Sequence, residues 1–370
     1  MILEKALLKL ARSNLHDEIK KLCAIEFCNE DINEIIDLLK KKVPEKLPTD
    51  EEIGAEIKAI LKENCDILTI NDDEYPKLLR EINIAPVVLV VKGDKNILLN
   101  NNIAVVGSRK TDIEDFGIIR EIVKNINDLG FGVASGIARG SDIIAHIQSI
   151  KTGTIAVLPC GLKYCYPAEH KSILDKIIDF NGIVISGFSF FEMPKQYNFV
   201  KRNSLIVGLS DSVVLMRARN VKCGSMISAN FAQKFNRSVY TLIFNNECDG
   251  NKYLLNRNLA TEITSFTQLR YSILSDVAMN EVELSESKDL QITNLSQSKN
   301  NLFANEQSFL KQNTQNYIYN EVRNIIFNKC SKIKKQESSF MFFYKICCND
   351  IKPNDEEKKE IIKALLENLL

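Results

Sequence analysis

The chain has 370 residues, of which 45% are hydrophobic and 26% charged, and its 48 basic side chains balance 48 acidic ones. This length allows two or three domains with a buried core, and the composition is that of an ordinary globular protein. A net charge of zero excludes a uniformly basic surface, so any nucleic-acid site has to rest on local charge. Such a local excess exists between Ser189 and Arg237, where only Glu192 and Asp211 oppose eight basic side chains.

Targeting signals and metal motifs are not apparent in the sequence. It contains no run of about 18 apolar residues, and its first residues lack the basic start of a secretory signal. None of the ten cysteines forms a C-x-x-C pair, and the three histidines are not at zinc spacing beside them. We therefore expect reduced thiols, no metal, no cofactor, no membrane span and a cytoplasmic location.

Residues 1–66 are predicted to form a small helical domain. Apolar residues repeat at helical spacing between Ile32 and Leu39. Thr49, followed by Glu52, is typical of a capping box that opens a second helix. The residues alone do not favour a chemical role for this domain over packing or partner binding.

Residues 67–270 are predicted to form a doubly wound α/β domain. The apolar runs suited to buried parallel strands are Val87–Val91, Ile103–Val106, Phe131–Ala134, Ile155–Leu158, Ile183–Ile185, Val213–Met216 and Val239–Phe244. Helical stretches between several of them are Ile113–Leu129, Asp142–Ile150, Ile173–Phe180 and Ser225–Phe235. This alternation predicts a mostly parallel sheet that binds its ligand beyond the carboxyl ends of the strands.

The last hundred residues change character. Residues 271–318 are rich in Ser, Asn, Gln and Lys, and are predicted to form a polar, largely disordered linker. Residues 319–370 are predicted to form a small helical tail of unknown role, with helix candidates at Tyr317–Phe327 and Asp355–Leu370.

Two glycine turns, each carrying an arginine, follow predicted strands. The first is Gly107–Arg109 and the second is Ser135–Gly140. A glycine turn that opens a helix presents backbone N–H groups and a positive dipole end, and an adjacent guanidinium matches a phosphate. Each turn alone is a weak signal, since a tight turn with a surface arginine explains the first equally well.

Two further segments are expected at the same edge of the sheet. Asn198–Ser204 places Lys201 and Arg202 side by side before the helical run Leu205–Leu209, and Cys223–Ser225 repeats the glycine–hydroxyl helix start. Adjacent cations suit a phosphate backbone, so the turns together predict one anion-binding trough. The nearby aromatic side chains either stack bases or close the core: Phe190, Phe191, Tyr197 and Phe199.

Other chemistries lack their signatures. The second turn is G-x-x-x-G rather than G-x-G-x-x-G, with no acid at ribose spacing, which disfavours NAD, and no P-loop is present. Asp142 and His146 share a helix face near Ser135 and Ser141, the members of a conceivable Ser–His–Asp triad. G-x-S-x-G is missing, however, and His146 is more simply a residue that packs or pairs locally. We therefore expect no enzyme.

The motifs follow one another in a recognisable order. In chain order they are Tyr75–Leu79, Pro86–Gly93, Val106–Arg109, Ser135–His146, Gly153–Leu158, Tyr166-Pro167, Phe199–Asn203 and Gly224-Ser225. This series, from about Asp73 to Ala260, resembles the DprA/Smf family, the DNA-processing proteins of bacterial natural transformation.

The resemblance implies an extended Rossmann-like domain, preceded by a sterile-alpha-motif-like helical extension, that binds single-stranded DNA without chemistry. It also implies a homodimer that protects incoming strands and loads the recombinase RecA onto them. The corresponding site residues, to which the basic pair adds Lys201, are Gly107, Ser108, Arg109, Ser135, Gly136, Arg139, Gly140, Arg202, Asn203, Gly224 and Ser225.

The chain departs from the family pattern at several places. Gly187 stands where the family usually has Glu, Ser204 where it has Arg, Ser141 where it has Ile and Arg217 where it has Glu. A lost arginine weakens phosphate contact, although Arg217 can replace some of that charge. Two rival functions therefore stay open: a degenerate member with a structural or regulatory role, and a related enzyme that cleaves nucleoside monophosphates. The sequence does not separate DNA from RNA.

Overall fold

The computed structural model describes residues 2–13, 20, 24, 47–244 and 248–293. The chain divides into two compact units, Met1–Ile32 with Glu45–Leu284, and Asn33–Pro44 with Ser285–Leu370. Of the second unit, only the last residues of one helix are described. The helix expected near Ile32–Leu39, the tail 319–370 and residues 294–318 of the expected linker lie outside the described residues.

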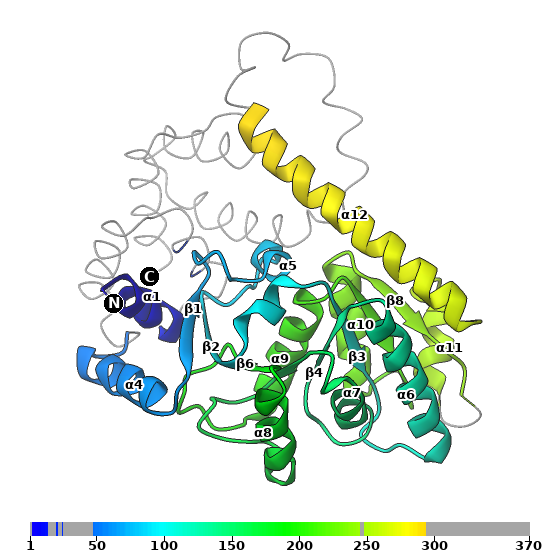
Figure 1. The fold of residues 1–370 in the computed structure, drawn as a ribbon, viewed down its shortest axis with the longest axis horizontal. Helices are drawn as coiled ribbons and strands as arrows, with labels where there is room; N and C mark the ends of the chain where they lie inside the picture. The colour runs from blue at the N-terminus through cyan, green and yellow to red at the C-terminus, as the bar shows by residue number, and fades with distance from the viewer. Residues whose placement is uncertain (1, 14–19, 21–23, 25–46, 245–247, 294–370) are drawn as a thin grey trace, which may run out of the picture. The chain divides into compact units, whose positions relative to one another are not determined.

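One sheet of nine strands runs through the first unit (Figure 1). Its strands are β1 (Asp66–Thr69), β2 (Val88–Gly93), β3 (Asn102–Val106), β4 (Gly132–Ser135), β5 (Thr154–Val157), β6 (Ile183–Ser186), β7 (Ser212–Leu215), β8 (Ser238–Thr241) and β9 (Thr261–Glu262). They are ordered β1-β2-β6-β5-β4-β3-β7-β8-β9. The seven strands predicted from apolar runs are all present, which confirms the doubly wound, Rossmann-like α/β class.

One strand direction was predicted wrongly. Strand β2, expected to be parallel, pairs antiparallel with both β1 and β6, whereas β3 to β9 pair in parallel with their neighbours in this part of the sheet. The run Val88–Val91 is fully buried, as in a parallel strand. A continuous apolar run reports burial on both faces of the sheet and carries no information about direction.

The described helices are α1 (Ile2–Arg12), α4 (Asp50–Lys62), α5 (Lys77–Glu81), α6 (Ile113–Asp128), α7 (Ser141–Ser149), α8 (Lys171–Asp179), α9 (Gln196–Gly208), α10 (Gly224–Lys234), α11 (Asp249–Asn256) and α12 (Phe266–Thr293), with 3-10 turns η2 (Lys95–Leu99) and η3 (Ala168–His170). The four helices predicted between strands are present as α6, α7, α8 and α10, and further helices such as α5 and α11 were not predicted. The predicted capping box of Thr49 and Glu52 opens α4. None of the described helices is both long enough and apolar enough to span a bilayer.

The strand order places a switch point between β3 and β7. From β3 the chain adds β4, β5 and β6 on one side, and it then returns to add β7 and β8 on the other. In open sheets of this kind, the crevice beyond the carboxyl ends of the two strands at the switch point receives the ligand. Residues that follow β3 and β7 are therefore the first place to look for a site.

Helix α12 corrects the predicted linker. Residues 271–293, expected to be disordered, are helical. Leu269, Ile273 and Val277 are buried in the main hydrophobic core, and the Asp276 carboxylate accepts hydrogen bonds from Ser238 Oγ at 2.8 Å and Tyr240 Oη at 2.6 Å. Three apolar residues four apart make one narrow stripe, which the polar composition of the segment concealed.

Candidate nucleic-acid interface

The turn after β3 lies at the switch point. A Cβ on Gly107 would come within 2.5 Å of Ser141 Oγ and 2.7 Å of Met216 Cβ, so only a glycine allows the ends of β3, β7 and α7 to meet here. The Ser141 N–H donates to the Ser108 carbonyl at 3.0 Å. The two glycine turns predicted to converge are thus in direct contact.

An exposed cation and two aromatic rings gather beside these turns. The Arg109 guanidinium lies 5.4 Å from the centroid of the Phe199 ring. Tyr166 meets the same ring edge-on, with centroids 5.4 Å apart and planes at 76°. We call Arg109, Phe199 and Tyr166 the rim stack. It joins the turn after β3, the loop after β5 and helix α9, and Tyr166 is 41% exposed.

Helix α9 changes the predicted roles of the basic pair. Lys201 and Arg202 were expected before a helix, but α9 already begins at Gln196, so both lie inside it. Successive residues of a helix point about 100° apart. Lys201 is therefore exposed while Arg202 is buried, so Arg202 does not lie exposed at the rim as expected. Asn203 Nδ2 donates to the Gly224 carbonyl at 3.2 Å, which joins α9 to α10.

The Arg202 guanidinium packs against the backbone of the second turn. A Cβ on Gly136 would lie 0.9 Å from Arg202 Nη1, so the glycine makes room for the guanidinium. Arg202 Nη1 lies 3.5 Å from the buried Asp142 Oδ2. Burial lowers the pKa of Arg202 and raises the pKa of Asp142, and the attraction between the two charges opposes both shifts. The pair supports the turn from inside.

The backbone of the second turn is also engaged internally. The Ile137 N–H donates to His146 Nε2 at 3.3 Å, and the Ala138 N–H donates to Asp142 Oδ2 at 3.4 Å. The Ile137 carbonyl accepts from His170 Nδ1 at 2.7 Å. Ile137 has φ of +58°, a conformation that is strained for a β-branched residue. Donors that the sequence suggested for a phosphate instead hold this turn in shape.

The residues of the conceivable triad are likewise committed to the fold. Ser135 Oγ donates to the Val105 carbonyl at 2.6 Å. His146 Nδ1 lies 2.7 Å from Thr154 Oγ1, and burial lowers the pKa of His146 to about 3, so the imidazole is neutral. His146 therefore pairs locally, as its position in the sequence suggested.

Arg139 is the exposed residue of the second turn. Its Nε and Nη2 donate to the two carboxylate oxygens of Glu169 at 2.5 and 2.9 Å, and both side chains are more than half exposed. The hydrogen bonds from Arg139 lower the pKa of Glu169. Gly140 follows, packed against the Ser108 carbonyl. Arg139 can thus meet a phosphate only in competition with Glu169.

The third turn opens α10 as predicted. Gly224 is the first residue of the helix, and apart from its chain neighbours and its own helix backbone, no atom of the described residues lies within 4 Å of the position that its Cβ would take. Ser225 is nearly buried, with its hydroxyl 3.2 Å from Cys223 Sγ. The backbone at Gly224 is therefore open to a ligand, whereas the Ser225 side chain is turned inward.

Arg217 does not supply the charge expected of it. It is buried, and its Nε and Nη2 donate to the Asp115 carboxylate at 2.8–3.0 Å, with Nη2 also 3.2 Å from Asp112 Oδ2. Its guanidinium lies 4.7 Å from the Phe244 ring centroid. Because Asp112 and Asp115 form the capping box of α6, Arg217 fixes the start of that helix.

The four aromatic side chains near α9 divide between core and surface. Phe190 is buried, Phe199 is partly buried, and Phe191 and Tyr197 are 40% and 54% exposed. Sequence spacing could not make this division, because Phe190 and Phe191 lie in a loop without a fixed period and the start of α9 at Gln196 was not predicted. Tyr166 is close to Phe199 only in the folded chain, because the two residues are 33 positions apart in the sequence.

The cysteine and acidic side chains of the described residues do not form a reactive thiol site or a metal site. These cysteines are free, and burial raises the pKa of Cys160 to about 12. Among the same described residues, no group of three or more His, Cys, Asp or Glu side chains is arranged to hold a metal ion.

The strand order, the switch point and the glycine turns define a Rossmann-like α/β protein. The sequence profile of the family described as DNA recombination-mediator protein A matches residues 66–273, which is more than half of the chain. The chain therefore belongs to this family, and the resemblance to the DprA/Smf proteins is confirmed.

Individual relatives agree with this assignment. Protein Smf of Synechocystis sp. is 33% identical over 187 residues, which cover 49% of this chain and 46% of that protein. DNA processing protein DprA of Streptococcus pneumoniae is 34% identical over 177 residues, 47% of this chain and 61% of that protein. The chain thus matches about half of the length of these relatives.

Two solved structures have the same fold. The X-ray structure of the Streptococcus pneumoniae DprA superimposes with a TM-score of 0.61 at 27% identity, over 73% of this chain and 98% of that one. A structure of DNA processing protein A from Helicobacter pylori, described for its single-stranded DNA binding mode, gives a TM-score of 0.53 at 29% identity, over 57% and 96% of the two chains.

Proposed function

We propose that this protein binds single-stranded DNA and that the rim stack is its main contact with the strand. The observation that carries the proposal is the placement of Arg109 and Tyr166 against Phe199 at the switch point of the sheet. An exposed ring offers a stacking face to any base, and a guanidinium beside it meets a phosphate. The Helicobacter pylori relative, described for single-stranded DNA binding, supports the same ligand.

Accessible charge near the turns favours a polyanion. Arg109, Lys110 and Lys201 are exposed, and Arg139 is exposed although paired with Glu169. Each phosphate neutralised on a single strand should add about −0.7 to the slope of log K against log salt. A strand that contacts these cations should therefore bind in a strongly salt-dependent way.

Binding without chemistry is part of this proposal. The hydroxyl of Ser135, the carboxylate of Asp142 and the imidazole of His146 are each committed to buried internal partners. A general base must reach the proton that it abstracts, and a neutral, buried His146 is a poor candidate. These positions favour a binding protein over an enzyme that would use Ser135, His146 and Asp142 as a triad.

A degenerate, purely structural role is the weaker alternative. Ser204, one of the departures from the family pattern, is buried, and its hydroxyl donates to the Lys201 carbonyl at 2.7 Å. The side chain at this position is directed into the fold. The exposed cations and the rim stack are independent of it, which favours a working nucleic-acid site.

The wider proposal is that the protein acts in DNA uptake or recombination in the cytoplasm. There it would protect incoming single strands as a homodimer and load RecA onto them. Light scattering of the purified protein tests the dimer. RecA filament assembly on strands coated with single-strand-binding protein tests loading, and faster assembly in the presence of this protein is the expected result. An unchanged assembly rate would contradict RecA loading but would leave the proposal of strand binding unaffected.

Fluorescence anisotropy with a labelled oligothymidine tests strand binding directly. We expect salt-sensitive binding that single-stranded DNA competes away and double-stranded DNA does not. Phe199→Ala should weaken it about tenfold or more, since stacking contributes about 1–3 kcal/mol per base. The control is Phe180→Ala, an exposed ring at the far end of α8. Absence of binding at low salt, or equal competition by duplex, would overturn the proposal, and an oligouridine competitor measures any preference for RNA.

A further inference from the structure

A second group of exposed aromatic and apolar side chains lies on the loop after β6 and the start of α9. Between residues 191 and 200, Phe191 is 40% exposed, Met193 61%, Tyr197 54% and Val200 41%. Large apolar side chains gathered at one place on a surface mark an interaction site more often than scattered ones do. None of them belongs to the rim stack.

Lysines are placed over these rings. Lys163 Nζ, from the loop after β5, lies 5.1 Å from the Phe191 ring centroid, and Lys195 Nζ lies 5.8 Å from that of Tyr197. The Glu192 carboxylate is already bonded, to Lys195 Nζ at 2.7 Å and to Tyr197 Oη at 3.2 Å. An apolar peptide could pack against the rings but would leave the lysines without a counter-ion. An acidic peptide could pair with the lysines but would not cover the rings. A chain of phosphates carrying flat bases satisfies both.

The two loops that carry these residues are held rigidly together. The Gly161 N–H donates to the Glu192 carbonyl at 2.8 Å, and the Lys163 N–H donates to the Phe190 carbonyl at 3.3 Å. Phe190 is buried, and Phe191 rests edge-on against it with centroids 5.4 Å apart. A surface that is already ordered loses little conformational entropy when a ligand binds.

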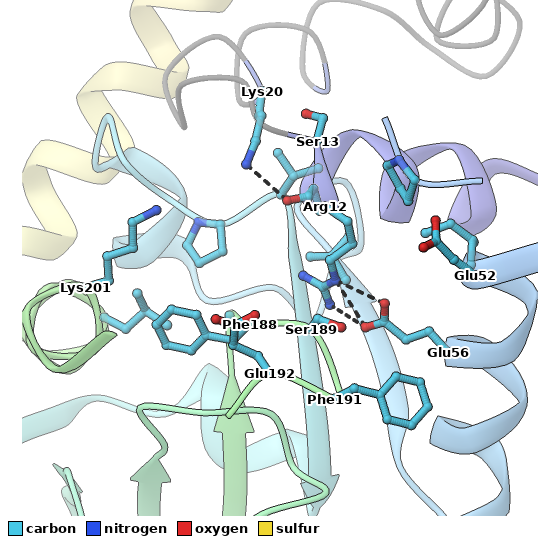
Figure 2. Close-up of a pocket in the computed structure, with 18 of the residues that line it drawn as sticks. Arg12, Ser13, Lys20, Glu52, Glu56, Phe188, Ser189, Phe191, Glu192 and Lys201 are labelled. Atoms are coloured by element: carbon cyan, nitrogen blue, oxygen red, sulfur yellow. Dashed lines mark hydrogen bonds and ion pairs between the residues drawn. The ribbon is translucent and has the colours of Figure 1, made fainter. Parts of the chain in front are cut away.

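The amino-terminal helices hold this surface in place. The Glu56 carboxylate, from α4, accepts the Phe190 N–H at 2.8 Å and the Nε–H of Arg12, from α1, at 3.1 Å. Both charged side chains are less than a tenth exposed. Figure 2 shows this pair beside Phe191, in the wall of a cavity of about 700 Å³ that Glu192 and Lys201 also line. Helices α1 and α4 thus position the loop after β6.

The surface continues from the rim stack. Lys163 and Tyr166 belong to the same loop after β5, three residues apart. At 3.8 Å between consecutive Cα atoms, their Cα atoms are at most about 11 Å apart, a distance that about three nucleotides span. A strand held at the rim stack can therefore reach these loops without a break.

We propose that Lys163, Phe191, Lys195 and Tyr197, here called the loop platform, form a second contact site for the same single strand. This inference rests on the proposed function. The rim stack holds one short stretch of nucleotides and the loop platform holds the next, so the platform matters only for strands long enough to reach it. The Arg12–Glu56 pair positions the platform and does not touch the strand.

The test compares oligothymidines of about 2 and about 20 nucleotides, shorter and longer than the roughly three nucleotides that span the distance from Tyr166 to Lys163. The variant Lys163→Ala/Phe191→Ala should bind the long strand about tenfold more weakly than wild type, with a salt slope shallower by about 0.7. The short strand should bind both proteins equally. The matched control is Lys176→Ala/Phe180→Ala, an exposed lysine of α8 and the exposed ring that follows the helix, and it should change neither affinity.

Two results would overturn the platform. One is an unchanged affinity of the double variant for the long strand, and the other is an equal loss for both lengths. Tyr197→Ala, which leaves the contact between Lys163 and Phe191 in place, serves as the second variant and should reproduce the length-dependent loss. Failure of the wild type to bind either strand would instead reject the proposed function, so the two failures are distinguishable.

Discussion

The turns after β3 and β4 follow the same plan in the sequence but have different structural roles. Each joins a parallel strand to a helix through glycine, and each carries an arginine. In the turn after β3, Arg109 faces outward and contacts Phe199. In the turn after β4, the backbone of Ile137 and Ala138 is bonded to buried side chains, and Arg202 lies beneath Gly136.

The difference shows that two turns with the same motif can have separate roles: one contacts the ligand, and the other holds the first in position. An exposed guanidinium is available to a ligand, whereas a buried one is held by its own counter-ion. The second turn therefore fixes the geometry of the first, through the bond from Ser141 N–H to the Ser108 carbonyl. Variants in the two turns should separate stability from binding.

Arg202→Ala should have the largest effect on stability. It leaves the buried Asp142 carboxylate without its counter-ion, and breaking a buried pair in this way costs about 3–5 kcal/mol. Urea unfolding measures the loss. Arg109→Ala, the matched variant of the outward arginine, should change the free energy of unfolding by less than about 0.5 kcal/mol while weakening strand binding. Equal stability losses in the two variants would contradict the assignment of Arg202 to support and of Arg109 to ligand contact.

His146 should make the second turn sensitive to acid. Burial lowers the pKa of His146 to about 3, well below the usual value of about 6.5 for histidine, so below about pH 6.5 the unfolded chain takes up a proton that the folded protein does not. Stability should therefore fall by up to about 1.4 kcal/mol per pH unit as pH drops below about 6.5.

The measurement is unfolding at pH 7 and pH 5 for wild type and His146→Asn. Because Asp142 is present in both proteins, the difference between their pH responses reports on His146. The variant should be less stable at pH 7 but lose less on acidification. An identical pH response in both proteins would show that His146 is not the group responsible.

Gly136, in the second turn, and Gly224, at the start of α10, should differ in their response to alanine. In Gly136→Ala, the new methyl group would displace the Arg202 guanidinium, with a cost of about 1–3 kcal/mol typical of overpacking. In Gly224→Ala the methyl group enters open space, so stability should stay within about 0.5 kcal/mol. Any loss of strand binding in Gly224→Ala would then result from contact between the new methyl group and the bound strand. Thermal unfolding and anisotropy together separate the two cases.

The fold could be predicted in large part because buried strands and glycine turns leave strong local patterns. All seven predicted strands and the meeting of Gly107 with the second turn follow from apolar runs and from the common edge of parallel strands. The direction of β2 and the extent of α12 could not be predicted from these sequence patterns. An apolar run carries no direction, and the buried stripe of Leu269, Ile273 and Val277 is narrow within a polar segment.

The site was harder to predict than the fold. Arg202 and Arg217 looked like ligand contacts because a sequence shows charge but not the partner that neutralises it. Their partners, Asp142 and Asp115, lie 60 and 102 residues away in the chain. Tyr166 was missed as a site residue for the same reason, since its contact with Phe199 crosses from one loop to another helix. Long-range pairing decides which charges and rings reach the ligand.

The smallest expected effect concerns Arg139, the only residue of the second turn that we expect to reach the strand. Its guanidinium is held by Glu169 in an exposed, two-point ion pair, and such pairs contribute little to stability. Glu169→Gln should therefore leave the unfolding midpoint unchanged but release Arg139 for a phosphate. Strand binding should strengthen slightly, and its salt slope should steepen by about 0.7. Glu121→Gln, an exposed acid on α6, is the control. If the slope stays the same in Glu169→Gln, Arg139 does not reach the strand, and the second turn serves only as support for the first.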